Sequence, residues 1–298
     1  MKNVINYYYN LYPTDIHYRA KKFYFDINDQ EYILMPFFIN EEKINKINNI
    51  ISLLDYNHIT YNNIQKNVTN NIVTYVSDIP YILIKINIKD KENIILNDLI
   101  LFNKKTSNLL NEVLDIQKLH NMWSNKIDYF EYQVNQFGIK FPIIRHSFNY
   151  FVGLSENAIT LLNNIKNSKI KTTIMHFRIS PKQKITDLYN PLSFVIDSKI
   201  RDISEFIKEK MFFCNVIDEV IYFFNYNQFT LDEIILFLSR IMYTTYYFDE
   251  CEKAIEENDE TYIKVLVSKI SNYENNIKKI YKYLLTKYNL PEINWLLI

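Results

Sequence analysis

Hydrophobic and polar residues alternate in two short segments near the start of the chain, as they do in half-buried β-strands. The segments are Lys21–Asp26 and Glu31–Phe37, and Asn28–Asp29 lies between them. Asn and Asp tolerate the left-handed backbone conformation that a tight hairpin turn requires. The pattern therefore predicts a β-hairpin.

The next segments alternate between helical and strand patterns. Ile and Leu recur at helical spacing over Glu41–Leu54, which predicts an amphipathic helix. Asn71–Ser77 and Tyr81–Ile88 predict two further strands, joined by a turn at Asp78–Pro80. Residues 1–90 are therefore expected to form a small sheet-rich lobe with one helix.

Helical periodicity dominates after the charged stretch Lys89–Asn93. Leu109–Phe137 is a long amphipathic pattern that ends beside a glycine, and Ser147–Asn167 predicts another helix. Two short strands are expected at Thr172–Phe177 and Ser193–Ile196, and helical patterns fill most of the remainder.

These elements predict an α+β protein with a sheet-rich lobe over 1–90 and a larger helical lobe over 91–298. With 48% hydrophobic residues in 298, the chain can bury a large core. Many α+β proteins share such a two-lobed outline, so the outline by itself assigns no function.

Composition excludes several classes of function. Lys plus Arg and Asp plus Glu are 34 each, so the chain lacks the basic field that supplies most non-specific affinity for nucleic acids. The most apolar window, Ile234–Phe248, is short and broken by Arg240, so no membrane span is expected and a cytoplasmic protein is the default. Only two glycines, Gly138 and Gly153, are present, which excludes glycine-rich phosphate-binding loops.

One segment of the distal half has the layout of a catalytic site. A loop is expected to begin at His176, and the dipeptide Ile196–Asp197 stands at the end of the next predicted strand segment. Asp202 and Glu205 have the spacing of a capping box, which predicts that a helix begins at Ile203.

Five blocks of sequence are distinctive: Tyr32–Phe37, Trp123–Val134, Phe141–Ile159, Phe194–Ile207 and Arg240–Glu252. They resemble the aminoglycoside-phosphotransferase branch of the protein-kinase-like superfamily. Within that branch they look most like the spore-coat-associated proteins of the CotS/YutH type from low-GC Gram-positive bacteria. The resemblance implies a two-lobed protein-kinase-like fold with a small antiparallel-sheet N-lobe and a mostly helical C-lobe. It also implies association with the spore coat.

The resemblance assigns roles in the loop, which in the family has the pattern His-Gly-Asp-x-His-Pro-x-Asn. His176 and Pro181 keep the family's residues, whereas Arg178 stands at the catalytic aspartate and Gln183 at the metal-binding asparagine. A guanidinium cannot accept a proton at any accessible pH. The loop is therefore degenerate, and no catalytic residue is assigned.

Two aspartates survive at family positions. Asp197 matches the metal-binding aspartate, and Asp202 matches the aspartate that anchors the following helix. For Asp197 a turn residue after a buried strand remains an alternative to a metal or ligand site. For Asp202, with Glu205, the capping box favours a structural role.

The small lobe has lost its expected lysine. Met35 stands at the position of the lysine that pairs with phosphate, and a thioether cannot do so. Lys21 or Lys22 on the neighbouring strand could substitute. The glutamate that pairs with such a lysine would be Glu41 or Glu42.

Two residues of the loop have both a structural and a functional interpretation. His176 is either a hydrogen-bonded loop residue or a participant in chemistry. Arg178 either forms an ion pair, with Asp197 or Asp202, or receives an anionic ligand.

The leading hypothesis is a degenerate kinase-like protein, a pseudokinase, that acts by binding or as a structural or assembly factor with an unknown protein partner. One alternative is a weakly active small-molecule phosphotransferase that uses Asp197 for magnesium. A second is a helical protein-interaction module outside the family. No cofactor is assigned, and ATP and magnesium remain open.

Overall fold

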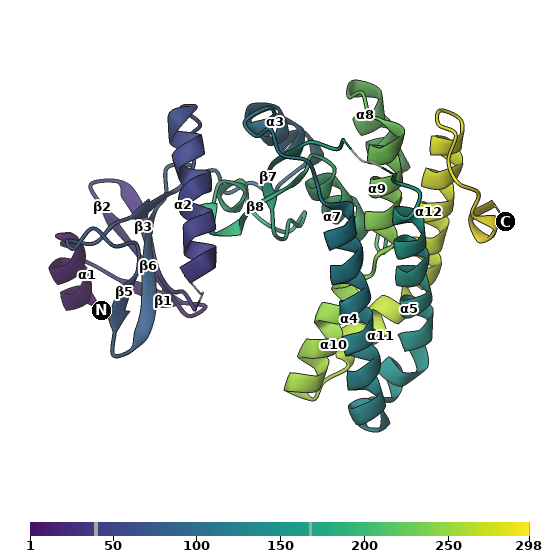
Figure 1. Cartoon of the computed structure of the whole chain (residues 1–298). Helices are drawn as coiled ribbons and strands as arrows, with labels where there is room; N and C mark the ends of the chain where they lie inside the picture. The colour runs from purple at the N-terminus through teal and green to yellow at the C-terminus, as the bar shows by residue number, and fades with distance from the viewer. Residues whose placement is uncertain (39–40, 167–168, 298) are drawn as a thin grey trace. The chain divides into compact units, whose positions relative to one another are not determined.

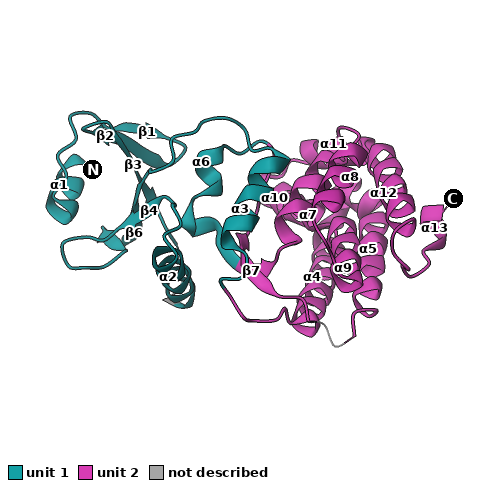
Figure 2. Ribbon diagram, turned by 90° about the horizontal axis from the view of Figure 1, so that it is seen from above, with its two compact units in different colours: residues 1–109, 182–195 teal, residues 110–181, 196–298 magenta. Residues whose placement is uncertain are grey.

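The computed structural model describes residues 1–38, 41–166 and 169–297, and the chain folds into two units. Unit 1 comprises residues 1–109 and 182–195, and unit 2 comprises residues 110–181 and 196–298 (Figure 2). Their boundaries differ from the expected 1–90 and 91–298, because residues 91–109 and 182–195 belong to unit 1. The antiparallel sheet of unit 1 and the helices of unit 2 confirm the expected α+β class.

Unit 1 is built on a six-stranded antiparallel sheet with the order β1-β2-β3-β6-β4, in which β5 also pairs with β6. Its elements are α1 (Lys2–Tyr9), β1 (His17–Arg19), β2 (Lys22–Ile27), β3 (Gln30–Pro36), α2 (Glu41–Tyr56), β4 (Asn63–Gln65), β5 (Thr74–Val76), β6 (Ile79–Lys85), α3 (Leu96–Thr106), α6 (Ile185–Leu188) and the short 3₁₀ helix η2 (Pro191–Ser193).

Successive side chains of β6 point to opposite faces of the sheet, and a helix packs on each face. Leu83 packs with Ile5 of α1 on one face. Ile82 and Ile84 pack with Ile47 of α2 on the other. Figure 1 shows α1 and α2 on opposite sides of the sheet.

The tight turns of unit 1 rely on left-handed residues other than glycine. The predicted hairpin is confirmed, with φ of 48° at Asn28 and 62° at Asp29. Ala20 and Lys21 turn the chain between β1 and β2 in the same conformation. The predicted turn at residues 78–80 is wrong, because Ser77–Asp78 form it and β6 begins directly afterwards. A two-residue hairpin turn needs positive φ at both positions, which Pro80 cannot adopt.

Unit 2 is mostly helical. Its elements are α4 (Ile116–Phe137), the 3₁₀ turn η1 (Gly138–Lys140), α5 (Pro142–Leu162), β7 (Thr172–His176), α7 (Arg201–Lys210), α8 (Ile217–Tyr226), α9 (Leu231–Met242), α10 (Thr245–Glu257), α11 (Thr261–Ser268), α12 (Ile270–Leu285) and α13 (Asn294–Leu297). α5 packs against α4 and α9, and α7 packs against α9. The rings of Phe151 and Tyr247 stack in this core with centroids 3.8 Å apart.

Both long predicted helices of unit 2 begin elsewhere than expected. α4 starts at Ile116, later than predicted, because the side chain of Asp115 caps it by accepting from the backbone N–H of Lys118 at 2.9 Å. α5 starts earlier than predicted, at Pro142, which suits a first helical position because proline lacks an N–H. The predicted end of that helix, Asn167, lies outside the described residues.

The most apolar window of the sequence is divided between α9 and α10, because the helix stops at Met242 and a new one starts at Thr245. Every residue of α9 from Glu233 to Met242 is buried, so its apolar character serves the core. Within the described ranges, no helix is long and apolar enough to cross a membrane.

Candidate functional site

Two of the predicted site residues lie in two short paired strands, β7 and β8 (Phe194–Ser198). His176 ends β7 with 1% of its surface exposed, and Asp197 lies in β8 with 7% exposed. A buried polar side chain needs hydrogen-bond partners, so the partners of these two residues define the site.

Both carboxylate oxygens of Asp202 bond to His176. One of its carboxylate oxygens accepts from the backbone N–H of His176 at 2.9 Å, and the other lies 2.6 Å from the ring Nδ1. The predicted capping box is therefore absent: α7 begins at Arg201, and Glu205 pairs with Lys208 at 3.0 Å instead of capping the helix. The local pattern fails because the buried histidine takes both oxygens of Asp202.

Asp197 is held by two arginines. Arg240 Nη2 donates to Oδ1 at 2.5 Å, and Arg201 Nη1 donates to Oδ2 at 2.6 Å. The backbone N–H of Ser198 also donates to Oδ1. Burial alone would raise the pKa of the Asp197 carboxyl, but the two guanidinium groups outweigh it and hold that pKa below its usual value. Asp197 is therefore an ionised residue in a buried ion triad.

Arg201 also fixes the start of the loop. Its Nε donates to the carbonyl of His176 at 2.7 Å, and its Nη2 donates to the carbonyl of Phe177 at 2.9 Å. One guanidinium thus joins the end of β7 to Asp197 in β8. This planar fork can serve several acceptors at once, which an ammonium cannot do with the same geometry.

Arg178 has a different partner from those expected. Its guanidinium donates to Asp249 of α10 at 2.8 Å, and Asp249 also accepts from Lys126 of α4 at 2.9 Å. The expected ion pair with Asp197 or Asp202 is wrong, since those carboxylates bind other groups. The Arg178 pair is half-exposed, so it holds the loop against α10 at the surface.

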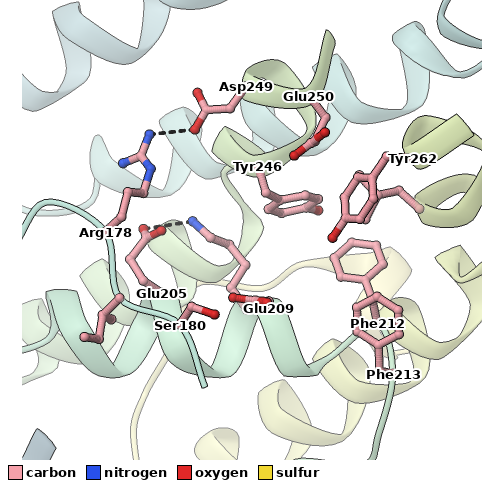
Figure 3. A pocket seen from close by; sticks show the side chains of 13 residues that line it. Arg178, Ser180, Glu205, Glu209, Phe212, Phe213, Tyr246, Asp249, Glu250 and Tyr262 are labelled. Carbon is pink, nitrogen blue, oxygen red and sulfur yellow. Dashed lines mark hydrogen bonds and ion pairs between the residues drawn. The ribbon is translucent and has the colours of Figure 1, made fainter. Parts of the chain in front are cut away.

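A pocket of about 240 Å³ lies beside this pair within unit 2. The loop, α7, α10 and α11 supply its walls (Figure 3). Figure 3 shows aromatic side chains gathered on the side of the pocket away from Arg178. The lining residues are Arg178, Ile179, Ser180, Glu205, Lys208, Glu209, Phe212, Phe213, Tyr246, Asp249, Glu250, Tyr262 and Leu266.

The lining is acidic and aromatic. Four carboxylates face two cations, one of which, Lys208, is buried against Glu205. The hydroxyl of Tyr246 is buried and has no hydrogen-bond partner among the described residues. Burial raises the pKa of that hydroxyl well above its usual value, so it stays a neutral donor. The sequence did not reveal this pocket, because its residues come from helices that are far apart along the chain.

Unit 1 has a cavity of its own, of about 610 Å³. Met35 lines it, as does Lys22, one of the two lysines considered as substitutes. Glu42 pairs with Lys46 on the surface of α2 at 2.5 Å, and the side chain of Glu41 lies outside the described part of the chain. Among the described side chains, Glu42 therefore does not pair with Lys21 or Lys22. The cavity lining contains a different lysine–glutamate pair, Lys91 and Glu31, 3.4 Å apart.

The backbone beside this cavity is paired within unit 1. Asn62 Oδ1 accepts from the N–H groups of Asn87 and Ile88, at 2.9 and 3.1 Å. Gln30 donates to the carbonyl of Ile86 at 2.6 Å, and Thr186 donates to the carbonyl of Ile88 at 2.8 Å. These peptide groups are consequently engaged before any ligand arrives.

The remaining loop residue, Gln183, belongs to unit 1, where its carbonyl accepts from the N–H of Ile94 at 2.9 Å. Among residues 1–38, 41–166 and 169–297, no group of three or more His, Cys, Asp or Glu side chains is placed to hold a metal ion.

Comparison with known structures identifies the fold. An aminoglycoside phosphotransferase from Alicyclobacillus acidocaldarius superposes with a TM-score of 0.63 at 9% identity, covering 96% of both chains. An AMP-bound spectinomycin phosphotransferase gives 0.62 at 13% identity, covering 94% of this chain and 96% of the other. Choline kinase from Streptococcus pneumoniae gives 0.55 at 10% identity, covering 95% and 98%. The chain therefore has the protein-kinase-like fold.

A search among curated protein sequences returned no significant match. The model of one protein family, described as "Spore coat putative kinase YutH", matches residues 2–287. That match covers both units and includes the loop at residues 176–183. The resemblance seen in the sequence is thus confirmed, and the chain belongs to the YutH family of spore coat putative kinases.

Proposed function

We propose that this protein uses a kinase-like fold to bind a small cationic ligand and does not transfer phosphoryl groups. The observation that carries the proposal is Arg178, which is bonded to Asp249 and which, by the sequence resemblance, stands where aminoglycoside phosphotransferases have their catalytic aspartate. Phosphoryl transfer depends on positioning and charge stabilisation, with a carboxylate that orients the nucleophile. A guanidinium cannot take that role, because it accepts no proton and would attract the phosphate itself.

The pocket of unit 2 supports a cationic ligand. Its lining has four carboxylates and two cations. Lys126 and Lys253, which lie outside the lining, pair with Asp249 and Glu250, so the charge that favours a cation is small and the aromatic rings add to it. Tyr246, Tyr262 and Phe212 add ring faces that attract ammonium groups. Solved relatives of the fold include a choline kinase and an aminopropanol kinase, which are named for ligands that carry an amine or ammonium group.

The size of the pocket limits the ligand. At about 240 Å³ it lies below the roughly 300–1,000 Å³ typical of sites for drug-sized molecules. A ligand with few heavy atoms fits this volume, whereas a multi-ring aminoglycoside does not. We therefore expect a small amine or quaternary ammonium compound.

A thermal-shift titration tests the binding. Choline is the cationic probe, and 3,3-dimethylbutanol is its uncharged counterpart of nearly equal shape. We expect choline alone to raise the melting temperature, and we expect the combined change of Glu209→Gln and Glu250→Gln to abolish that rise. Glu256→Gln, on the exposed side of α10, is the matched control. Equal shifts with both probes would rule out recognition of charge.

A separate assay tests the absence of turnover. ATP consumption is measured with choline, aminopropanol and a set of sugars and aminoglycosides. We expect no consumption above that of a protein-free control. Turnover that is lost in Asp197→Asn would instead support the second candidate, a weakly active phosphotransferase. The kinase-like fold excludes the third expectation, a helical module outside the family.

The family description motivates the cellular part of the proposal, which is a role in the spore coat with an unidentified protein partner. A fluorescent fusion of the full chain, imaged in a sporulating host, would test it. We expect fluorescence around the forming spore, and a diffuse cytoplasmic signal throughout sporulation would contradict that placement.

A further inference from the structure

The Asp197 carboxylate stands at the position of a metal ligand, and two arginines of the chain already neutralise its charge. Asp197 bonds Arg240 through one oxygen and Arg201 through the other. Arg240 has 3% of its side chain exposed and Arg201 has 12%, so neither can move into solvent without rearranging the core. The triad joins β8 to α7 and to α9.

A magnesium ion would need this carboxylate in a different arrangement. Mg²⁺ binds carboxylate oxygens at about 2.0–2.1 Å in a strict octahedron and keeps several waters. The guanidinium groups lie 2.5 and 2.6 Å from the two oxygens, where the ion and its waters would have to be. Binding would therefore place a divalent cation beside two fixed cations, or strip both arginines of their partner.

The charges around Asp197 also balance without a metal. Three carboxylates lie in this part of unit 2, at Asp197, Asp202 and Glu205. Three permanently or normally charged cations accompany them: Arg201, Lys208 and Arg240. A metal site, in contrast, has an excess of negative ligands that the ion neutralises.

From this geometry we propose that Arg201 and Arg240 take the place of a divalent cation at Asp197, so that the protein organises this site without a metal. The residues present do not fit the magnesium that the fold's enzymes imply. The inference rests on the ion triad and is independent of which ligand the other pocket binds.

Two measurements on the full chain test it, with Asp197→Asn and Glu219→Gln as variants. Glu219 also holds a cation, Lys210, but it is partly exposed and lies outside both the triad and the pocket, so it is the matched control. The first measurement follows free Mn²⁺ by electron paramagnetic resonance while protein is added. The second follows the melting temperature with ATP, in EDTA or in MgCl₂, which covers a metal that arrives only with nucleotide.

For the wild-type protein we expect the free Mn²⁺ signal to match that of Asp197→Asn. We also expect the apparent Kd for ATP, obtained from the melting shift, to agree within about twofold in EDTA and MgCl₂, a difference of about 0.4 kcal/mol in binding. Stoichiometric Mn²⁺ binding, or a shift that requires magnesium, overturns the inference if Glu219→Gln keeps it and Asp197→Asn loses it. The wild-type measurements alone decide the case if Asp197→Asn does not fold. ATP turnover without a metal at Asp197 would refute the proposed function only.

Discussion

Asp197 and Asp249 each pair with two basic side chains, but they differ in burial. Comparing them tests how burial determines the contribution of an ion pair to the free energy of unfolding. Asp197 binds Arg201 and Arg240 with 9% of its side chain exposed, and Asp249 binds Arg178 and Lys126 with 36% exposed. Replacement of either by Asn keeps the shape and removes the charge. We expect Asp197→Asn to destabilise unit 2 strongly and Asp249→Asn to change it little.

The expected magnitudes follow from the environments. Removing one partner of a buried pair costs about 3–5 kcal/mol, because the remaining charge stays buried without compensation. In Asp197→Asn the new side-chain amide would also place a donor against a guanidinium donor, so a loss of about 3 kcal/mol is a lower estimate. An exposed pair is worth about 0–1 kcal/mol. At about 2 °C per kcal/mol for a chain of this length, the melting temperature should fall by roughly 6 °C in Asp197→Asn and by at most about 2 °C in Asp249→Asn.

Urea unfolding followed by tryptophan fluorescence is a suitable assay, because both tryptophans, Trp123 and Trp295, belong to unit 2. Trp123 is buried and stacks on Tyr243 with centroids 4.2 Å apart, so its emission should report loss of the core. Equal urea midpoints for Asp197→Asn and Asp249→Asn would refute the reasoning, since burial would then not determine the loss.

Three further outcomes are expected. Burial opposes ionisation of Asp197 and Glu205, but neighbouring cations outweigh it and lower both pKa values, so the urea midpoint should stay level down to about pH 5 and fall below about pH 4. That fall should be smaller in Asp197→Asn, and an identical profile would contradict the assignment. Tyr246→Phe removes a buried hydroxyl without a partner among the described residues, so unit 2 should gain about 1 kcal/mol in urea unfolding while choline binding weakens; a loss of stability would be the opposite result. Asn62→Ala removes the shared acceptor of two part-buried N–H groups and should cost unit 1 about 1 kcal/mol, seen as faster hydrogen exchange at Asn87; unchanged exchange there would count against the pairing.

Elements that depend on neighbouring residues could be predicted from the sequence. The hairpin at Asn28–Asp29 followed from two residues that accept positive φ, and the helix over Glu41–Tyr56 followed from its apolar spacing. The family resemblance was also carried by contiguous blocks. Such signals are complete within a few residues, so no knowledge of distant partners was needed.

The ion pairs of the site could not be predicted in this way. Asp197 and Arg240 are 43 residues apart, and Arg178 and Asp249 are 71 apart. No local pattern says which arginine reaches which carboxylate. The capping box at Asp202 was predicted from a local pattern, yet it does not form. The buried His176 bonds to both oxygens of Asp202, so neither is left to cap the helix.

The loop and the pocket beside it differ in the residues that they present. At the loop, Arg178 and Asp197 are each committed to partners within the chain, so neither position supplies a carboxylate that could orient a nucleophile. The pocket has four lining carboxylates, of which Glu205, Asp249 and Glu250 pair with basic side chains, and it has aromatic rings beside them. Ring faces next to carboxylates can attract an ammonium group. The ion pairs of the loop therefore stabilise the structure, whereas the binding that we propose is assigned to the pocket.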